Sequence, residues 1–273
     1  MRLPDHRHAT IVHLINMELS TIKTQLKTEI LGRNLVCFKE TNSTNAVAKN
    51  LAATGAPEGL VVVAEVQTEG RGRAGHKWDS PAGGLWFSVL LRPAFSPATT
   101  PAISLLAGVA VAKALRDLHF INAMVKWPND VIVDGKKLCG ILCEASIQGD
   151  KIEYVVVGVG MDVNNDASKL ALEDGAIQPT SVRDALGKEV DMPQLLAYVL
   201  LEMEKLYHRS KVGFGPIIEE WTALSDTIGK HVEITDDSGK FKGTARRVTP
   251  EGALVVDTGK EEKVVIAGDC RYV

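Results

Sequence analysis

Two arginines and a lysine lie close together in the segment 67–78, which reads QTEGRGRAGHKW. Three glycines hold this segment open between two apolar runs, 60–66 and 85–91, that are typical of buried strands. Guanidinium groups bind carboxylates and phosphates through paired, directional hydrogen bonds. The segment therefore predicts a mobile loop that captures an anionic ligand. The simpler alternative is a flexible loop whose arginines are only solvated.

The same segment matches the pattern G-x-G-x-x-G through Gly70, Gly72 and Gly75. A dinucleotide site of that kind needs a helix to open at the third glycine, so that its first amides meet a pyrophosphate. Pro81 and the glycines at 83 and 84 follow instead, and they disfavour a helix. We therefore reject a dinucleotide-binding loop.

Two further cationic groups follow along the chain. The segment 126–130 reads KWPND, and Lys136 and Lys137 begin an apolar run. Pro128 with Asn129 and Asp130 is also compatible with a plain turn, and the paired lysines with solvated charges of a hairpin. The residue types alone do not decide between a binding role and a structural role for either group.

A polar group precedes the convincing helix 46–53. Ser43, Thr44 and Asn45 are residue types that cap the free amides of a first helical turn. Their remaining hydroxyl and amide groups could also bind a polar ring of a ligand at the helix start. Both roles are compatible.

Hydrophobic periodicity predicts the elements that must position these groups. We expect strands at 35–39, 60–66, 85–91, 136–146 and 151–160, and helices at 20–31, 46–53, 101–120, 191–210 and 214–225. Asp134 and Gly135 predict a tight hairpin turn. After residue 226 short strands alternate with turns, which is typical of a small β-barrel. The predicted units are a short extension with one helix (1–34), a catalytic domain (35–225) and the barrel (226–273).

Composition excludes several classes of protein. The formal net charge of -3 gives no global attraction to nucleic acid or membrane. No apolar run approaches the roughly 20 residues of a membrane span. The four cysteines are scattered, so we expect reduced thiols and no zinc site. With no recognisable signal peptide, a cytoplasmic location is expected.

In this order the motifs resemble those of biotin protein ligases. The resemblance covers roughly residues 35–273 and is specific at 43–45, 67–78, 126–130, 137–141 and 158–164. It implies an α+β fold: a mixed β-sheet backed by helices, of the class II aminoacyl-tRNA synthetase and biotin ligase kind, followed by a small SH3-like barrel.

The family chemistry has two steps. The biotin carboxylate attacks the α-phosphate of ATP to give biotinyl-5'-AMP and pyrophosphate, and a lysine of a biotin carboxyl carrier protein or carboxylase carrier domain then displaces AMP. Two anions must meet in the first step, so the site must supply positive charge. The resemblance assigns this catalytic role to Lys137, Arg73 and Arg71.

The resemblance also implies the ligand contacts. Biotin would contact Ser43, Thr44, Asn45, Gln67, Arg71, Gly72, Arg73, Lys137, Gly140 and Ile141. ATP would contact Arg71, Arg73, Trp78, Lys126, Asn129, Asp130, Lys137, Asp162 and Asn164. Asp130 would help to hold magnesium.

Two positions depart from the family pattern. His76 stands where arginine is common, and Asp162 stands where asparagine is usual. An acid does not donate a hydrogen bond as an amide does. These departures therefore leave open an alternative, a protein that binds biotin but does not catalyse its reaction. A lipoate or octanoate ligase-type acyl transferase is the nearest enzymatic alternative.

The expected partners are limited. Residues 1–34 are too short for a three-helix DNA-reading domain, so we expect no specific DNA binding, and no membrane association. The family leaves open a homodimer formed through exposed sheet edges.

Overall fold

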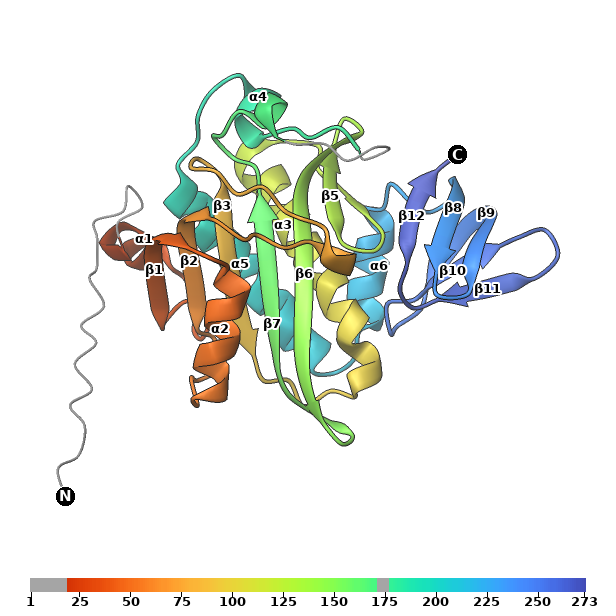
Figure 1. Ribbon diagram of the computed structural model, residues 1–273, viewed down its shortest axis with the longest axis horizontal. Coiled ribbons are helices and arrows are strands. Elements are labelled where there is room, and N and C mark those ends of the chain that lie inside the picture. Colours follow the sequence, from red (N-terminus) through yellow and green to blue (C-terminus); the bar gives the residue numbers. More distant parts are fainter. Residues whose placement is uncertain (1–18, 171–176) are drawn as a thin grey trace.

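The computed structural model describes residues 19–170 and 177–273. A large mixed β-sheet with helices on both faces makes up most of the molecule, and a smaller antiparallel sheet follows at the C-terminal side (Figure 1). The two units lie side by side, with strand β12 (Asp269–Tyr272) of the small sheet nearest to the large one.

The large sheet has seven strands in the order β1-β2-β3-β7-β6-β5-β4. Strands β1 and β2 are parallel, and every other neighbouring pair is antiparallel. The strands are β1 (Leu35–Thr41), β2 (Val61–Gln67), β3 (Leu85–Leu91), β4 (Met124–Lys126), β5 (Asp130–Val133), β6 (Lys136–Gln148) and β7 (Lys151–Met161). The strands expected from the sequence are confirmed.

The apolar runs form central strands because both of their faces are covered. Every residue of β3 is buried. On one side Val62 and Leu90 pack against Ala48 and Ala52 of α2 (Thr44–Ala53), whose small side chains let the helix lie close to the sheet. The opposite side faces the main core under the long helices. A strand buried on both faces reads as a continuous apolar run, as β2 and β3 do.

Helix α3 (Thr100–His119) is the centre of the main core. It packs against α5 (Met192–Ser210) and α6 (Gly215–Ala223), and all three were expected from the sequence. By length and hydropathy, Pro97–His119 could cross a membrane, contrary to the expectation that no run approached that length. Of its most apolar 18-residue window, 67% is buried inside the protein, as in the core helix of a globular domain.

The first helix is shorter than predicted. Helix α1 covers Leu19–Gln25 instead of reaching residue 31. The amides of Glu29, Ile30 and Leu31 donate to the buried carboxylate of Glu204, at 2.6, 2.8 and 2.7 Å. A carboxylate that binds three successive amides replaces the helical carbonyls as their acceptor. A short helix, α4 (Val182–Leu186), was not expected.

The small unit is a five-stranded antiparallel sheet in the order β11-β10-β9-β8-β12. Its strands are β8 (His231–Asp236), β9 (Gly239–Val248), β10 (Leu254–Asp257), β11 (Glu262–Val265) and β12. Trp127 attaches this unit to the large one. Its amide donates to Thr227 Oγ1 at 3.0 Å, and its indole Nε1 donates to the carbonyl of Gly252 at 3.1 Å.

The turn between β5 and β6 agrees with the sequence. Asp134 and Gly135 both have positive φ, 49° and 73°. Two successive residues of this kind make the tight turn that matches the twist of a hairpin. The turn places Lys137 at the start of β6, next to the central strand β7.

Candidate functional site

One cavity of about 510 Å³ collects residues from every motif singled out in the sequence. The arginine segment, the start of α2, strands β6 and β7, the segment 126–130 and strand β12 all contribute to it. The predicted contact residues that line it are Ser43, Thr44, Asn45, Gln67, Arg71, Gly72, Arg73, Trp78, Lys126, Asn129, Asp130, Lys137, Gly140, Ile141 and Asp162.

One end of the cavity is formed at the start of α2. Ser43 is the N-cap, and its hydroxyl accepts from the amide of Ala46 at 3.4 Å. The amide and the hydroxyl of Thr44 both donate to Gln67 Oε1, at 2.8 and 3.1 Å. Ser43 caps the helix and also lines the cavity, so the two roles considered for it are compatible in the structure. We call Thr44 and Gln67 the ring-binding pair, a name that stands for the biotin contacts expected of both residues.

Asn45 lies at the floor of this end. Its Nδ2 donates to Leu142 O at 3.2 Å and to Glu144 Oε2 at 2.8 Å, and its Oδ1 accepts from Ser88 Oγ at 2.6 Å. A Cβ on Gly158 would lie 2.2 Å from Asn45 Oδ1. The glycine therefore makes room for the amide, and the protein itself already uses both ends of that amide.

The arginine segment forms a loop closed at its base. The amide of Trp78 donates to the carbonyl of Gly70 at 2.9 Å, and a 3-10 turn, Arg73–Gly75, lies at the tip. No α-helix opens at Gly75, in agreement with the rejection of a dinucleotide loop. We call residues 70–78 the arginine loop.

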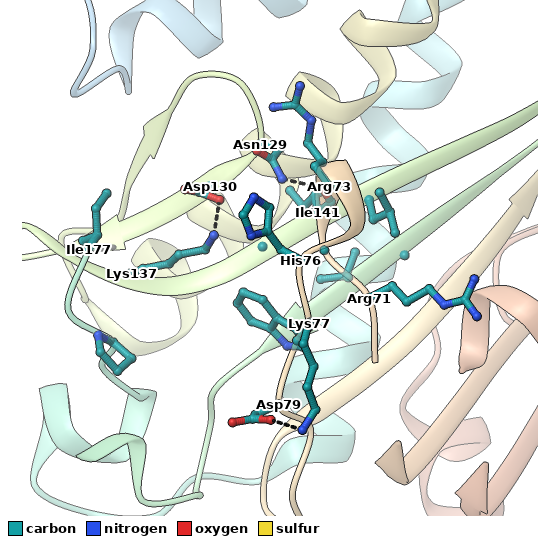
Figure 2. Close-up of a pocket in the computed structure, with 18 of the residues that line it drawn as sticks. Arg71, Arg73, His76, Lys77, Asp79, Asn129, Asp130, Lys137, Ile141 and Ile177 are labelled. Carbon is teal, nitrogen blue, oxygen red and sulfur yellow. Dashed lines mark hydrogen bonds and ion pairs between the residues drawn. The ribbon is translucent and has the colours of Figure 1, made fainter. Parts of the chain in front are cut away.

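The two arginines of this loop point in different directions. The side chain of Arg71 is 64% exposed and extends away from the centre of the cavity, with Glu69 Oε2 3.9 Å away (Figure 2). Arg73 Nη1 donates to the carbonyl of Gly268 in the small unit at 3.3 Å. Burial lowers the pKa of Arg73, while Asp269 and Asp130 act in the opposite direction. Arg73 thus joins the loop to the small unit.

Lys137 occupies the middle of the cavity. Its Nζ lies 2.7 Å from Asp130 Oδ1 and 5.1 Å from the centre of the Trp78 ring, within range of a cation–π interaction. The same ion pair is drawn in Figure 2. Lys137 lines the cavity, and its catalytic role stays a prediction.

The Trp78 ring lies on a flat area of the sheet made by two glycines. Gly140 and Gly160 are partners across β6 and β7. A Cβ would lie 2.9 Å from Trp78 at the first position and 2.5 Å from Trp78 Nε1 at the second. Gly160 was not among the predicted contacts. The pairing of the two glycines across strands was the missing signal, and one sequence does not reveal that register.

The small unit supplies part of the cavity wall. Lys126 is buried, and its Nζ donates to the carbonyl of Cys270 at 2.6 Å and lies 5.2 Å from the centre of the Tyr272 ring. Asn129 Nδ2 donates to the carbonyl of Ile141 at 2.7 Å. Four residues of β12 line the cavity and were not predicted: Asp269, Cys270, Arg271 and Tyr272.

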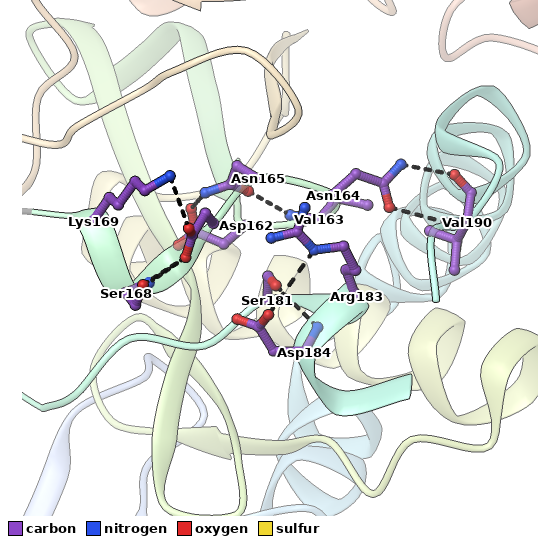
Figure 3. Close-up of polar contacts among 11 residues, drawn as sticks. Asp162, Val163, Asn164, Asn165, Ser168, Lys169, Ser181, Arg183, Asp184 and Val190 are labelled. Atoms are coloured by element: carbon purple, nitrogen blue, oxygen red, sulfur yellow. Dashed lines mark hydrogen bonds and ion pairs between the residues drawn. The ribbon is translucent and has the colours of Figure 1, made fainter. Parts of the chain in front are cut away.

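Asp162 is buried behind Lys137, and Asn165 Nδ2 donates to its Oδ1 at 2.7 Å (Figure 3). Burial raises the pKa of Asp162 to about 7, and the hydrogen bond from Asn165 and the charge of Lys137 oppose that rise. Near neutral pH a substantial share of this carboxyl is therefore protonated. A protonated carboxyl can donate one hydrogen bond, which qualifies the expectation that an acid here cannot donate.

Asn164 lies outside the cavity. Its Nδ2 donates to the carbonyl of Val190 at 2.9 Å, and its Oδ1 accepts from the amide of Val190 at 3.0 Å (Figure 3). The side chain holds the segment before α5 instead of facing the ligand space. The predicted contact of Asn164 with ATP has no support in this geometry, because Asp162 and Asn164 diverge after β7 ends.

Both units of the chain match models of known families. Residues 37–162 match the Biotin/lipoate A/B protein ligase family, and residues 227–271 match the Biotin protein ligase C terminal domain. The chain is 31% identical over 232 residues to the biotin--[acetyl-CoA-carboxylase] ligase of Paracoccus denitrificans, covering 84% of this chain and 96% of that protein. This chain belongs to the biotin protein ligase family.

Two further members are similar over most of the chain. The bifunctional ligase/repressor BirA of Bacillus subtilis is 36% identical over 252 residues, which cover 92% of this chain and 77% of that protein. The biotin protein ligase of Aquifex aeolicus, solved in complex with biotin and ATP, superposes with a TM-score of 0.75 at 28% identity. That superposition covers 88% of this chain and all of the other. The expected fold, a mixed sheet followed by an SH3-like barrel, is confirmed.

The donor set of the cavity is compatible with one metal contact. Asp130 is the carboxylate nearest to Lys137, and within 19–170 and 177–273 no group of three or more His, Cys, Asp and Glu side chains could hold a metal ion. Magnesium commonly keeps its waters and binds one or two carboxylates together with substrate phosphates. Asp130, one of four aspartates that line the cavity, is therefore compatible with a magnesium ion that arrives with a nucleotide.

Proposed function

We propose that this chain is a biotin protein ligase that activates biotin as biotinyl-5'-AMP and transfers it to a lysine of a biotin carboxyl carrier protein. One observation carries the proposal. A pair of ring-binding polar groups, a central lysine and a cationic loop line one cavity, in the fold of a protein solved with biotin and ATP. The relatives that match both units of the chain favour this activity over lipoate or octanoate transfer.

In the first step a biotin carboxylate oxygen bonds to the α-phosphorus of ATP. The bond from that phosphorus to the bridging oxygen breaks, and pyrophosphate leaves with the electron pair. In this proposal Lys137 stabilises charge where the two anions meet, and Lys126 and Arg73, which line the same cavity, supply further positive charge. Fixed charges in a water-poor cavity stabilise such a transition state better than water does.

Magnesium is proposed as the metal of this step. Asp130 would hold it together with phosphate oxygens, and the ion would neutralise charge on the departing pyrophosphate. The ion pair with Lys137 keeps this carboxylate oriented toward the cavity.

In the second step the neutral amine of a carrier lysine attacks the carbonyl carbon of the mixed anhydride. AMP leaves with the electron pair, and the amine loses a proton as the amide forms. The adenylate reacts with water if it is exposed, so the site must stay covered until the carrier arrives. The arginine loop is the segment suited to cover it, because it is closed at its base and reaches the small unit through Arg73.

We also propose a reducing cytoplasm and no specific DNA binding. Burial raises the pKa of the Cys270 thiol to about 11 and that of Cys139 well above its usual value, so both stay protonated thiols near neutral pH.

The net charge of -3 supports no general affinity for nucleic acid. Retention on DNA that is sequence-selective and sensitive to salt would contradict this part of the proposal.

The test is exchange of labelled pyrophosphate into ATP, with magnesium, in the presence of biotin, lipoate or octanoate. Exchange with biotin alone is expected. Exchange driven by lipoate or octanoate instead would move the chain to the alternative transferase activity. Binding of biotin without any exchange would identify a protein that binds biotin but has lost the chemistry.

A further inference from the structure

A chain of partly buried hydrogen bonds connects the ring-binding pair to the base of the arginine loop. Gln67 Oε1 accepts from the amide and the hydroxyl of Thr44, at 2.8 and 3.1 Å. Gln67 Nε2 then donates to Ser80 Oγ at 2.9 Å, and Ser80 Oγ donates to the carbonyl of Trp78 at 3.1 Å. Ser80 does not line this cavity. Its side chain nonetheless connects the ring-binding pair with the base of the arginine loop.

The direction of every bond in this chain is fixed by its two ends. The backbone amide of Thr44 can only donate, so the oxygen of the Gln67 side chain must face it. The Gln67 nitrogen then faces Ser80, whose hydroxyl must accept. The single proton of that hydroxyl is left for the carbonyl of Trp78, which can only accept. Removing the Ser80 hydroxyl therefore leaves a donor and an acceptor without their partner.

The surroundings of Ser80 are closely packed on the side of the loop base. Ser80 is buried, and the amide of Gln67 donates to its carbonyl at 3.1 Å. A Cβ on Gly70 would lie 2.3 Å from the carbonyl oxygen of Trp78 and 2.6 Å from Ser80 Oγ. The loop base, the hydroxyl and the glutamine side chain are therefore packed together, and a change in one shifts the others.

We propose that Ser80 is a positioning residue that sets the orientation of the Gln67 amide and couples it to the base of the arginine loop. The proposal rests on the proposed function, because the occupant of the ring-binding end is taken to be the polar ring of biotin. Binding of that ring by Thr44 and Gln67 then steadies Trp78, and with it the loop that covers the ligand.

The test compares Ser80→Ala with Ser210→Ala in the full chain. Ser210 is also buried, and its hydroxyl donates to the carbonyl of Tyr207 at 2.7 Å, away from the cavity. Calorimetry should show biotin binding to Ser80→Ala weakened about tenfold, as expected for one buried hydrogen-bonding group left unpaired. ATP binding measured without biotin should change less than twofold, and Ser210→Ala should leave both affinities unchanged.

A double-mutant cycle separates this role from general loosening of the fold. In a Gln67→Ala background, Ser80→Ala should weaken biotin binding less than twofold, because its effect acts through Gln67. An unchanged biotin affinity in the single Ser80→Ala variant, or the same tenfold loss in both backgrounds, would overturn the proposal. Ser80→Cys keeps the shape with a weaker acceptor and gives the same comparison should the alanine variant not fold.

Trypsin tests the loop without relying on biotin, because Arg71, Arg73 and Lys77 are cleavage sites. Cleavage within the arginine loop should be several times faster in Ser80→Ala than in the wild type or in Ser210→Ala. Equal cleavage rates would contradict the coupling to the loop. Failure of the wild type to bind biotin would instead contradict the proposed function, while the cleavage comparison would still decide the role of Ser80.

Discussion

The two ends of the cavity differ in how far their side chains are already committed to the protein. At the start of α2, Thr44 and Asn45 are 3% and 6% exposed, and both are held by the fully buried Ser88. In the arginine loop the side chains of Arg71 and Lys77 are 64% and 74% exposed, and their ion pairs lie at the surface. The end at α2 is held in place by hydrogen bonds within the protein. The arginine loop carries exposed charges that are available to an arriving ligand.

This difference suits a reaction that first recognises a neutral ring and then joins two anions. A fixed end loses little conformational entropy when it binds, which favours selection of the ring. Exposed cations interact weakly with one another in water and strongly with an anion that displaces that water. We therefore expect changes at the central cation to affect chemistry most, and changes at the surface of the loop to affect the free protein least.

The largest effect is expected at the junction of the two ends. Lys137→Ala should lower biotin-dependent pyrophosphate exchange by roughly 10²–10³-fold, the usual cost of removing one group that stabilises a transition-state charge. Binding of biotin should persist, because the ring-binding pair is intact. Lys136→Ala is the matched control, since the neighbouring lysine is exposed and outside the cavity. Equal losses in the two variants would refute a specific role for Lys137.

The next largest effect concerns the attachment of the loop to the small unit. Arg73→Gly removes the contact with the Gly268 carbonyl and should leave the fold intact while the loop opens more often. Release of biotinyl-5'-AMP, measured as labelling of bystander lysines, should rise about tenfold, as for the loss of one charged hydrogen bond. Full activity without any release of adenylate would show that the loop does not retain the intermediate.

The sequence predicts the features that depend on a continuous stretch of chain, and it does not predict those that depend on contacts between elements. Strands β2 and β3 are predictable because continuous apolar runs fit a sheet buried on both faces. The cavity-lining motifs are predictable because each is contiguous. Gly160 and the residues of β12 act through partners far away in the chain, and Ser80 acts through the side chain of Gln67 on another element. Their roles depend on register and packing, which a single sequence does not specify.

Two departures from a local sequence pattern have similar causes. Helix α1 ends early because Glu204, on a distant helix, accepts the amides of residues 29–31. Asn164 follows the motif by position but turns toward Val190. In both cases a tertiary hydrogen bond outweighed a local pattern, since local helical preferences are worth only tenths of a kcal/mol for each residue.

A smaller effect is expected from the pH dependence of stability at Asp162. Its pKa is raised in the folded protein, to about 7 from 3.8, so the folded state binds more protons than the unfolded state between these values. Stability from this group is present at low pH and is lost as the pH rises through 7. Between pH 6 and 8 the free energy of unfolding should fall by about 1 kcal/mol relative to an Asp162→Asn variant.

Urea denaturation of both proteins at pH 6 and pH 8 measures this difference. Asp166→Asn serves as the control, because the pKa of that fully exposed carboxyl is lowered, mainly by a hydrogen bond from Ser168, and it stays ionised across this range. Parallel stability curves for the wild type and Asp162→Asn would mean that Asp162 is ionised throughout and does not act as a donor near neutral pH.

The smallest effect is expected from the exposed charge of the loop. Glu69→Gln removes the partner 3.9 Å from Arg71 and should change the free energy of unfolding by less than about 0.5 kcal/mol. Glu144→Gln, at the fixed end, disturbs a carboxylate that binds both Asn45 and Lys49 and should cost about 1–2 kcal/mol. Urea denaturation compares the two. Equal costs would mean that the loop is as firmly held as the ring-binding end, and that its arginines are structural before they are functional.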